Sequence, residues 1–125
     1  MFEKLKILIV EDDPASLIVS VKSFERRGAE VLVATDAYGA LKIYSETCNL
    51  SAVITDIQLP GMDGTEMMHM MRAEEERKGV AVPIFAMTAY ALGEDKDFFI
   101  SQGFDDVFVK PVDYDKILKT VQFYT

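Results

Sequence analysis

Short apolar runs alternate with amphipathic segments from one end of the chain to the other. The runs are rich in Val, Ile, Leu and Phe, which is typical of strands buried on both faces. The segments between them carry apolar residues at helical spacing, with Pro, Asp or Gly at their ends. The pattern predicts strands at 6–10, 30–34, 52–55, 82–87 and 106–109. It predicts helices at 14–27, at 37–46, from Asp63 to about 78, at 93–102, and after Asp113.

This fivefold repetition of strand and helix predicts the fold class. Right-handed crossovers between parallel strands place helices on both faces of a sheet. We therefore expect an α/β protein with a doubly wound, five-stranded parallel sheet. No linker, repeat or low-complexity segment interrupts the pattern, so residues 1–125 are expected to form a single domain.

Composition narrows the function classes that such a fold can serve. Thirteen basic residues stand against 21 acidic ones, and the formal net charge is −8. This surface repels nucleic acid and anionic lipid and favours cations, so we expect no direct binding to nucleic acid or membrane. Cys48 is the only cysteine, which excludes an internal disulfide and suits a cytoplasmic protein. The apolar run at 7–10 is too short for a signal peptide or a membrane span.

The candidate site residues lie directly after four of the five predicted strands. The carboxyl ends of parallel strands meet at one edge of a sheet, where ligands bind, so these residues should converge although they are far apart in sequence. A charged surface without a site would scatter them over both edges. The residues at this edge are Glu11, Asp12 and Asp13 after the first strand, Asp56 after the third, Thr88 after the fourth and Lys110 after the fifth.

The residue types at this edge indicate phosphoryl chemistry. Clustered carboxylates repel one another, and a divalent cation that prefers oxygen relieves the repulsion. Mg²⁺ suits one or two carboxylates together with water and a phosphate oxygen. Asp56 is the carboxylate best placed to act as a nucleophile and form an acyl phosphate. Lys110 and the Thr88 hydroxyl could then bind the phosphoryl oxygens.

Four motifs in order, ILIVEDD, VITDIQLPGMDG, FAMTAYA and VFVKPV, resemble the receiver domain of two-component response regulators over essentially the whole chain. The resemblance implies a flavodoxin-like fold of the CheY type, with strand order 2-1-3-4-5. It implies a single receiver domain that takes a phosphoryl group from a phosphohistidine and then signals to an effector. The donor would be a sensor histidine kinase or a histidine phosphotransfer domain. Such a domain promotes its own phosphorylation and dephosphorylation and is not otherwise an enzyme.

The resemblance also assigns roles within the site. Mg²⁺, or Mn²⁺ in its place, would be held by Glu11, Asp12, Asp56 and the Gln58 carbonyl, with Asp12 as a direct ligand. Asp56 would be the phosphoacceptor, and the phosphoryl group would contact Thr88, Ala89 and Lys110. The peptide bond between Lys110 and Pro111 is expected to be cis. Asp13 has no assigned role and could be only a charge at a helix start.

One position departs from the family pattern. Receivers usually carry Tyr or Phe three residues before the lysine, where it couples to the switch threonine, here Thr88. This chain has Val107 at that position, and strand alternation points Phe108 to the opposite face of the sheet. The mode of signalling is therefore in question, whereas phosphorylation is not. Tyr90 and Gln58, two residues after Thr88 and Asp56, are expected to border the path of the attacking water.

Three other functions compete with the receiver interpretation. A haloacid-dehalogenase-type phosphatase would need a second Asp as general acid at the position of Gln58. A flavodoxin-like carrier would not place Glu11, Asp12 and Asp13 against a flavin phosphate. A binding module that is never phosphorylated would normally lack the acceptor Asp, the Lys or the acidic pair, and this chain has them all.

Several other features are interpreted as structural. Met67, Met68 and Met71 share a helical face and are expected to fill the core. His69 is expected on the outer side of the same helix, exposed and without a partner. The charged run at 74–78 is interpreted as a solvated helix end.

Overall fold

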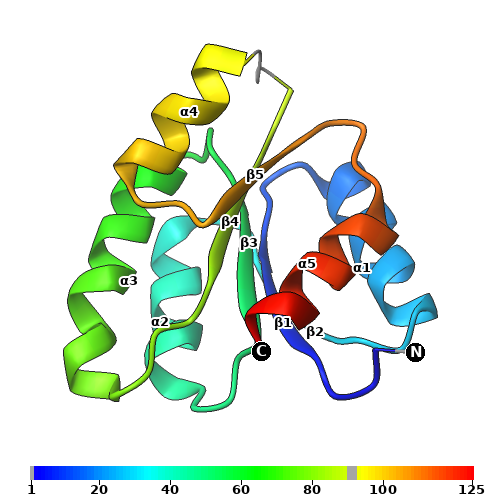
Figure 1. Ribbon diagram of the computed structural model, residues 1–125, viewed down its shortest axis with the longest axis horizontal. Helices are drawn as coiled ribbons and strands as arrows, with labels where there is room; N and C mark the ends of the chain where they lie inside the picture. Colours follow the sequence, from blue (N-terminus) through cyan, green and yellow to red (C-terminus); the bar gives the residue numbers. More distant parts are fainter. Residues whose placement is uncertain (1, 90–92) are drawn as a thin grey trace.

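The computed structural model describes residues 2–89 and 93–125, and within them strands and helices alternate as the sequence predicts (Figure 1). The strands are β1 (Lys6–Val10), β2 (Glu30–Ala34), β3 (Ala52–Asp56), β4 (Ile84–Thr88) and β5 (Asp106–Val109). The helices are α1 (Pro14–Arg26), α2 (Ala37–Glu46), α3 (Gly64–Lys78), α4 (Gly93–Gln102) and α5 (Tyr114–Tyr124).

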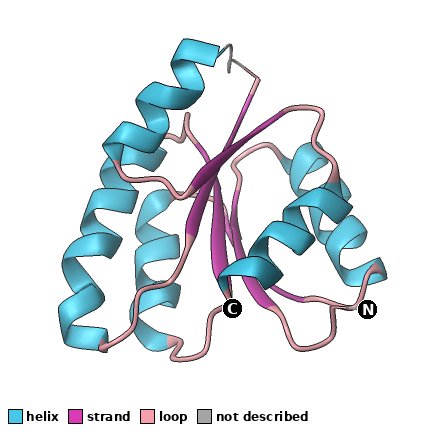
Figure 2. Cartoon of the chain, viewed as in Figure 1, coloured by secondary structure: helices cyan, strands magenta, loops and turns pink. Residues whose placement is uncertain are grey.

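The described strands form one parallel sheet in the order β2-β1-β3-β4-β5. Helices α1 and α5 cover one face, and α2, α3 and α4 cover the other (Figure 2). The inner strands β1, β3 and β4 therefore bury both of their faces and read as continuous apolar runs, whereas the edge strand β2 is partly exposed. The predicted fold class and strand order are confirmed.

Two apolar cores, one on each side of the sheet, result from the alternation of side chains along the strands. In β1, Leu8 and Val10 join the core under α2 and α3, whereas Ile7 and Ile9 join the core under α1 and α5. The three methionines predicted to be buried, Met67, Met68 and Met71, are fully enclosed in the first of these cores.

Strand β4 starts two residues later than predicted. Pro83 has no backbone N–H, so it cannot donate to the ladder, although its carbonyl accepts a hydrogen bond from the Val53 N–H at 2.9 Å. The strand runs from Ile84 and ends on Thr88 rather than before it. Likewise β3 ends on Asp56. Neither difference moves the Asp56 and Thr88 side chains away from the carboxyl edge of the sheet.

Two interpretations of helix α3 were wrong. His69 is exposed, but it has a partner, since its Nε2 lies 2.8 Å from the carbonyl oxygen of Gln102. The charged helix end is not merely solvated either. Lys78 Nζ donates to the carbonyls of Tyr44 (2.6 Å) and Thr47 (2.8 Å), which ties the end of α3 to the end of α2. Sequence periodicity does not reveal contacts to backbone carbonyls of another element.

Among the described residues, no helix is long and apolar enough to cross a bilayer.

Candidate functional site

A pocket of about 280 Å³ opens at the carboxyl edge of the sheet. It lies where the chain leaves β1, β3, β4 and β5, so residues far apart in sequence meet there as expected. Six of the predicted site residues line it: Asp12, Asp56, Gln58, Thr88, Ala89 and Lys110.

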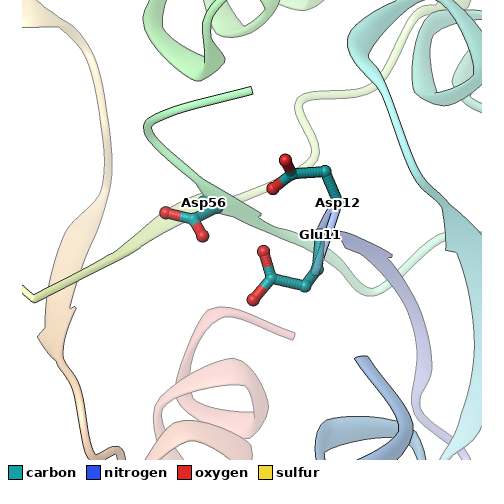
Figure 3. Close-up of side chains that lie close together, drawn as sticks. All are labelled: Glu11, Asp12 and Asp56. Carbon is teal, nitrogen blue, oxygen red and sulfur yellow. The ribbon is translucent and has the colours of Figure 1, made fainter. Parts of the chain in front are cut away.

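Three carboxylates, those of Glu11, Asp12 and Asp56, lie close together at the ends of β1 and β3 (Figure 3). One oxygen from each lies within 4.8 Å of the others. The pairing of β1 with β3 produces this approach, because it continues to the last residue of β1 and the residue before Asp56. Their exposure differs: Glu11 is only 1% exposed, Asp56 is partly buried and Asp12 is exposed.

Lys110 supplies the positive charge of the site. Its Nζ donates to Asp56 Oδ2 at 2.8 Å and to Glu11 Oε1 at 3.2 Å. The Lys110 backbone N–H donates to the Thr88 carbonyl at 2.9 Å, which fixes the start of the side chain next to β4. Burial alone would lower the pKa of Lys110, but hydrogen bonding and attraction to Asp56 and Glu11 outweigh it and raise that pKa. The lysine is therefore held charged beside the Asp56 carboxylate.

Glu11 is the least solvated charge of the site. Burial raises the pKa of Glu11 to about 7, the neighbouring Asp56 acts in the same direction, and Lys110 opposes both. Among the described residues, no group donates a hydrogen bond to its buried Oε2. A buried carboxylate oxygen without a donor is costly, and a cation would remove that cost.

The donor set fits a hard divalent cation. All three side chains offer carboxylate oxygens, the ligands that Mg²⁺ prefers, and Asp12 and Asp56 both face the pocket. Three carboxylates against one lysine leave a local excess of negative charge. A cation in the pocket would compensate it.

Both oxygens of Asp56 are oriented by hydrogen bonds. Oδ1 accepts from the Ile57 N–H at 2.9 Å, and Oδ2 accepts from Lys110. The Thr55 hydroxyl donates to the Asp56 carbonyl at 2.8 Å and steadies the backbone. Thr88 is buried, 6% exposed, at the end of β4 and also lines the pocket. A carboxylate, a lysine and a hydroxyl therefore share one small space.

Gly64 supports the backbone at Asp56, a role that the sequence pattern did not reveal. Its N–H donates to the Ile57 carbonyl at 2.8 Å, and α3 begins on it. A Cβ built on Gly64 would overlap the carbonyl oxygen of Asp56 and lie 3.2 Å from the Cα of Ile57. The first turn of α3 can therefore lie directly against the Asp56 backbone only because residue 64 has no side chain.

Substitution of this glycine should loosen the site. We expect Gly64→Ala to destabilise the fold by about 1–3 kcal/mol, because the overlapping atoms are backbone and cannot swing aside. Gly39→Ala is the matched control, since a Cβ there meets only the side chains of Asp36 and Ala34. Urea unfolding of both variants measures the difference. Equal midpoints for Gly64→Ala and the wild type would show that the contact imposes no constraint.

Asp13 has a structural role. Its Oδ2 accepts from the Ser16 N–H at 3.0 Å and from the Ser16 hydroxyl at 2.7 Å, so it is the N-cap of α1. It lies outside the cluster of three carboxylates. The sequence left open whether Asp13 is only a charge at a helix start, and the structure shows that it caps helix α1.

The position that usually holds an aromatic residue is filled by a small buried side chain. Val107 is 4% exposed and packs in the core under α2 and α3, opposite Ala86 in the sheet register. Phe108 packs in the other core, so it does face away, as predicted. Tyr90, which was expected to shield the site from water, lies outside the described residues. The peptide bond between Lys110 and Pro111 is cis, as expected.

Comparison with known sequences gives a consistent result. The family model described as "Response regulator receiver domain" matches residues 7–122. The sensor histidine kinase GacS of Pseudomonas protegens is 36% identical over 96% of the chain. The chain spans only about 13% of the length of that kinase and of its Pseudomonas syringae counterpart. An uncharacterised 14.6 kDa protein of Leptolyngbya boryana is 36% identical over 97% of the chain and 90% of its own length.

Solved structures show the same architecture. The receiver domain of the sensor histidine kinase PA1611 from Pseudomonas aeruginosa, which has a magnesium ion coordinated in its active site cleft, superposes with a TM-score of 0.83. It is 29% identical and covers 96% of each chain. The receiver domain of Saccharomyces cerevisiae Ssk1, solved with the histidine phosphotransfer protein Ypd1, gives a TM-score of 0.85 at 28% identity over 99% of this chain and 90% of that one. The chain belongs to the response regulator receiver domain family and is a receiver domain of two-component signalling systems.

Proposed function

We propose that Asp56 is the phosphoacceptor of this domain and takes its phosphoryl group from a phosphohistidine. The observation that carries the proposal is the contact between Lys110 and Asp56 beside the carboxylates of Glu11 and Asp12. An isolated aspartate is a weak nucleophile for phosphoryl transfer. This one lies beside groups that can neutralise the charge that develops on the phosphoryl oxygens.

The transfer uses groups from four strand ends. A carboxylate oxygen of Asp56 attacks phosphorus in line and forms the new O–P bond. The N–P bond to the donor imidazole breaks, and its electron pair stays on the nitrogen. Lys110 moves from the carboxylate to a phosphoryl oxygen, and Thr88 and the Ala89 N–H donate to the others. Mg²⁺, held by Asp12, Asp56 and the Gln58 carbonyl with Glu11 behind them, would supply further positive charge. Mn²⁺ offers similar chemistry and is proposed as a substitute.

The competing enzymatic function lacks its essential group. A phosphatase of the haloacid-dehalogenase type protonates its leaving group with a second carboxylic acid, and here the residue at that place is Gln58, whose amide cannot do so. A receiver is a signalling domain, and we propose that this one turns over no substrate beyond its own phosphoryl group. A flavin carrier is disfavoured by the acidic loop after β1, and an absorbance spectrum of the purified protein tests it.

The donor is proposed to be a sensor histidine kinase or a histidine phosphotransfer domain, and the output an effector protein, in the cytoplasm. Helix α1, which follows β1 at the carboxyl edge of the sheet, offers an apolar surface for the donor. Ile18 and Val19 lie in the second turn of this helix, and each is 55% exposed. Val19 also lines a cavity of about 430 Å³ together with Pro111 and Val112, and Lys110 borders both this cavity and the acceptor pocket. A donor seated there would reach Asp56.

Phosphorylation by a small donor tests the proposal. The wild type incubated with acetyl phosphate and Mg²⁺ should gain the mass of one phosphoryl group by intact-mass spectrometry. Asp56→Asn should gain none, because an amide cannot form the acyl phosphate, and excess EDTA should prevent the gain in the wild type. Mn²⁺ should restore it. A mass gain that survives Asp56→Asn would refute the assignment.

A further inference from the structure

Within helix α4 the structure describes the side chains of residues 95–102, and their contacts with the rest of the fold gather near the C-terminal end. From Asp95 to Gln102 only Phe99 and Gln102 are partly buried, whereas Phe98 and Ile100 are exposed. The Phe99 ring packs against that of Phe104, just after the helix. The ion pair of Lys96 with Asp106, at 3.4 Å, is partly exposed to solvent and contributes little. Among the described residues, the contacts at the C-terminal end of α4 are therefore important for its position.

Two side chains of α3 bind that end. His69 Nε2 lies 2.8 Å from the Gln102 carbonyl oxygen, and Arg72 Nη2 donates to the Gly103 carbonyl at 2.9 Å. Three residues apart on α3, they lie on one face of the helix. The last carbonyls of a helix lack partners within it and carry its negative dipole end, so they suit a histidine and an arginine.

Arg72 is itself fixed on several sides. It donates to Asp105 Oδ2 at 2.6 Å, to the Val82 carbonyl at 3.0 Å and to Glu75 Oε1 at 2.7 Å. The same Asp105 oxygen accepts from the Ile84 N–H at 2.8 Å. The guanidinium thus joins α3 to the segments before β4 and before β5. A shift of α3 cannot leave the end of α4 unaffected unless these bonds break.

The other end of α3 lies against the phosphoacceptor. Gly64 starts the helix in direct contact with the Asp56 backbone, and its N–H holds the Ile57 carbonyl. Ile57 also donates its N–H to Asp56 Oδ1. A phosphoryl group on Asp56 would change what this carboxylate and Lys110 bind, and the Ile57 segment and the start of α3 lie directly against Asp56. Val107, on β5, is too short and too stiff to carry a response by swinging between two distant positions.

We propose that α3 transmits phosphorylation to α4, with His69 and Arg72 as the positioning residues that couple the two helices. This rests on the proposed function, because it takes Asp56 as the phosphoacceptor. Phosphorylation changes how the start of α3 packs against the Asp56 backbone at Gly64. The contacts of His69 and Arg72 with the Gln102 and Gly103 carbonyls then pass the displacement of α3 to α4. The change in the receiver surface then concentrates at the C-terminal end of α4 rather than at β5. Phosphorylation can shift an equilibrium between two positions of α4 only if it favours the contacts made in one of them. The coupling therefore depends on the contacts of His69 and Arg72 with the end of α4.

Backbone NMR with beryllofluoride, which stands in for the phosphoryl group, tests the inference on the full chain. The shift changes caused by beryllofluoride are compared within each variant, so that the direct effect of the substitution cancels. In the wild type they should be large at 56–58 and at 98–104, and smaller at 106–109. In His69→Ala and in Arg72→Gln the changes at 98–104 should largely disappear, while those at 56–58 persist. Arg77→Gln is the matched control, because Arg77 lies on the same helix and pairs only with Glu74 among the described residues.

The outcomes separate the inference from the function on which it rests. His69→Ala is the decisive variant, because Arg72 also supports the segments before β4 and β5. Changes at 98–104 that persist unaltered in His69→Ala would refute the coupling, as would their absence from a wild type that responds at 56–58. No response at 56–58 in the wild type would instead overturn the proposed function of Asp56.

Discussion

Replacing Lys110 by Ala should slow phosphorylation of Asp56 by acetyl phosphate about a hundredfold or more, as expected when one preorganised donor to a transferring group is lost. The reason is the 2.8 Å contact of the ammonium with Asp56. It places the charge within reach of a phosphoryl oxygen before transfer starts. Intact-mass spectrometry at successive times gives the rate.

The same substitution should strengthen Mg²⁺ binding. Lys110 lies against Glu11 and Asp56, so its ammonium and a divalent cation compete for the same carboxylates. Titration calorimetry should give a lower Kd for the variant, whereas Lys96→Ala, at the Asp106 ion pair on another surface, should match the wild type in both assays. A variant that phosphorylates at the wild-type rate would show that Lys110 is structural.

Ile18→Ser combined with Val19→Ser should slow phosphorylation by a protein donor about ten- to hundredfold, the cost of removing central apolar contacts from an interface. Both side chains are more than half exposed, and Val19 lines a cavity that shares Lys110 with the Asp56 pocket, so the change removes contact area without emptying the core. Phosphorylation by acetyl phosphate, which needs no docking surface, should be unchanged. The two rates in parallel separate docking from chemistry.

Val80→Ser is the matched control, because Val80 is 50% exposed in the loop before β4, at the opposite edge of the sheet. It should phosphorylate normally with both donors. Equal loss with the protein donor in Val80→Ser and in the α1 variant would mean that surface apolarity in general, and not α1, assists the donor. Loss with acetyl phosphate in the α1 variant would place the defect in the site.

Local rules were sufficient for the fold class and for Asp56, Thr88 and Lys110 in the pocket, whereas the strand order and the pocket residues Gln58 and Ala89 were implied by the family resemblance. Continuous apolar runs identify strands covered on both faces, and parallel strands place their carboxyl ends together. Asp56, Thr88 and Lys110 could therefore be brought to one pocket without knowledge of any distance. The opposite orientations of Val107 and Phe108 follow from strand alternation in the same way.

The supporting contacts could not be predicted, because they join side chains to the backbone of distant elements. Nothing in the sequence marks Gly64 as the residue that lies against the Asp56 carbonyl, since glycine after a turn has many uses. His69, Arg72 and Lys78 bind carbonyls of other segments, and a carbonyl has no residue type to recognise. A histidine on the outer side of a helix was therefore misread as unpartnered.

Chemical trapping of the acyl phosphate tests the identity of the acceptor most directly. Borohydride reduces an aspartyl phosphate to homoserine and releases phosphate, so it marks the residue that carried the phosphoryl group. After treatment with acetyl phosphate and Mg²⁺, peptide mass spectrometry should find homoserine at position 56 and at no other carboxylate of the cluster. Reduction at Glu11 or Asp12, with Asp56 intact, would contradict the assignment of Asp56 as the phosphoacceptor.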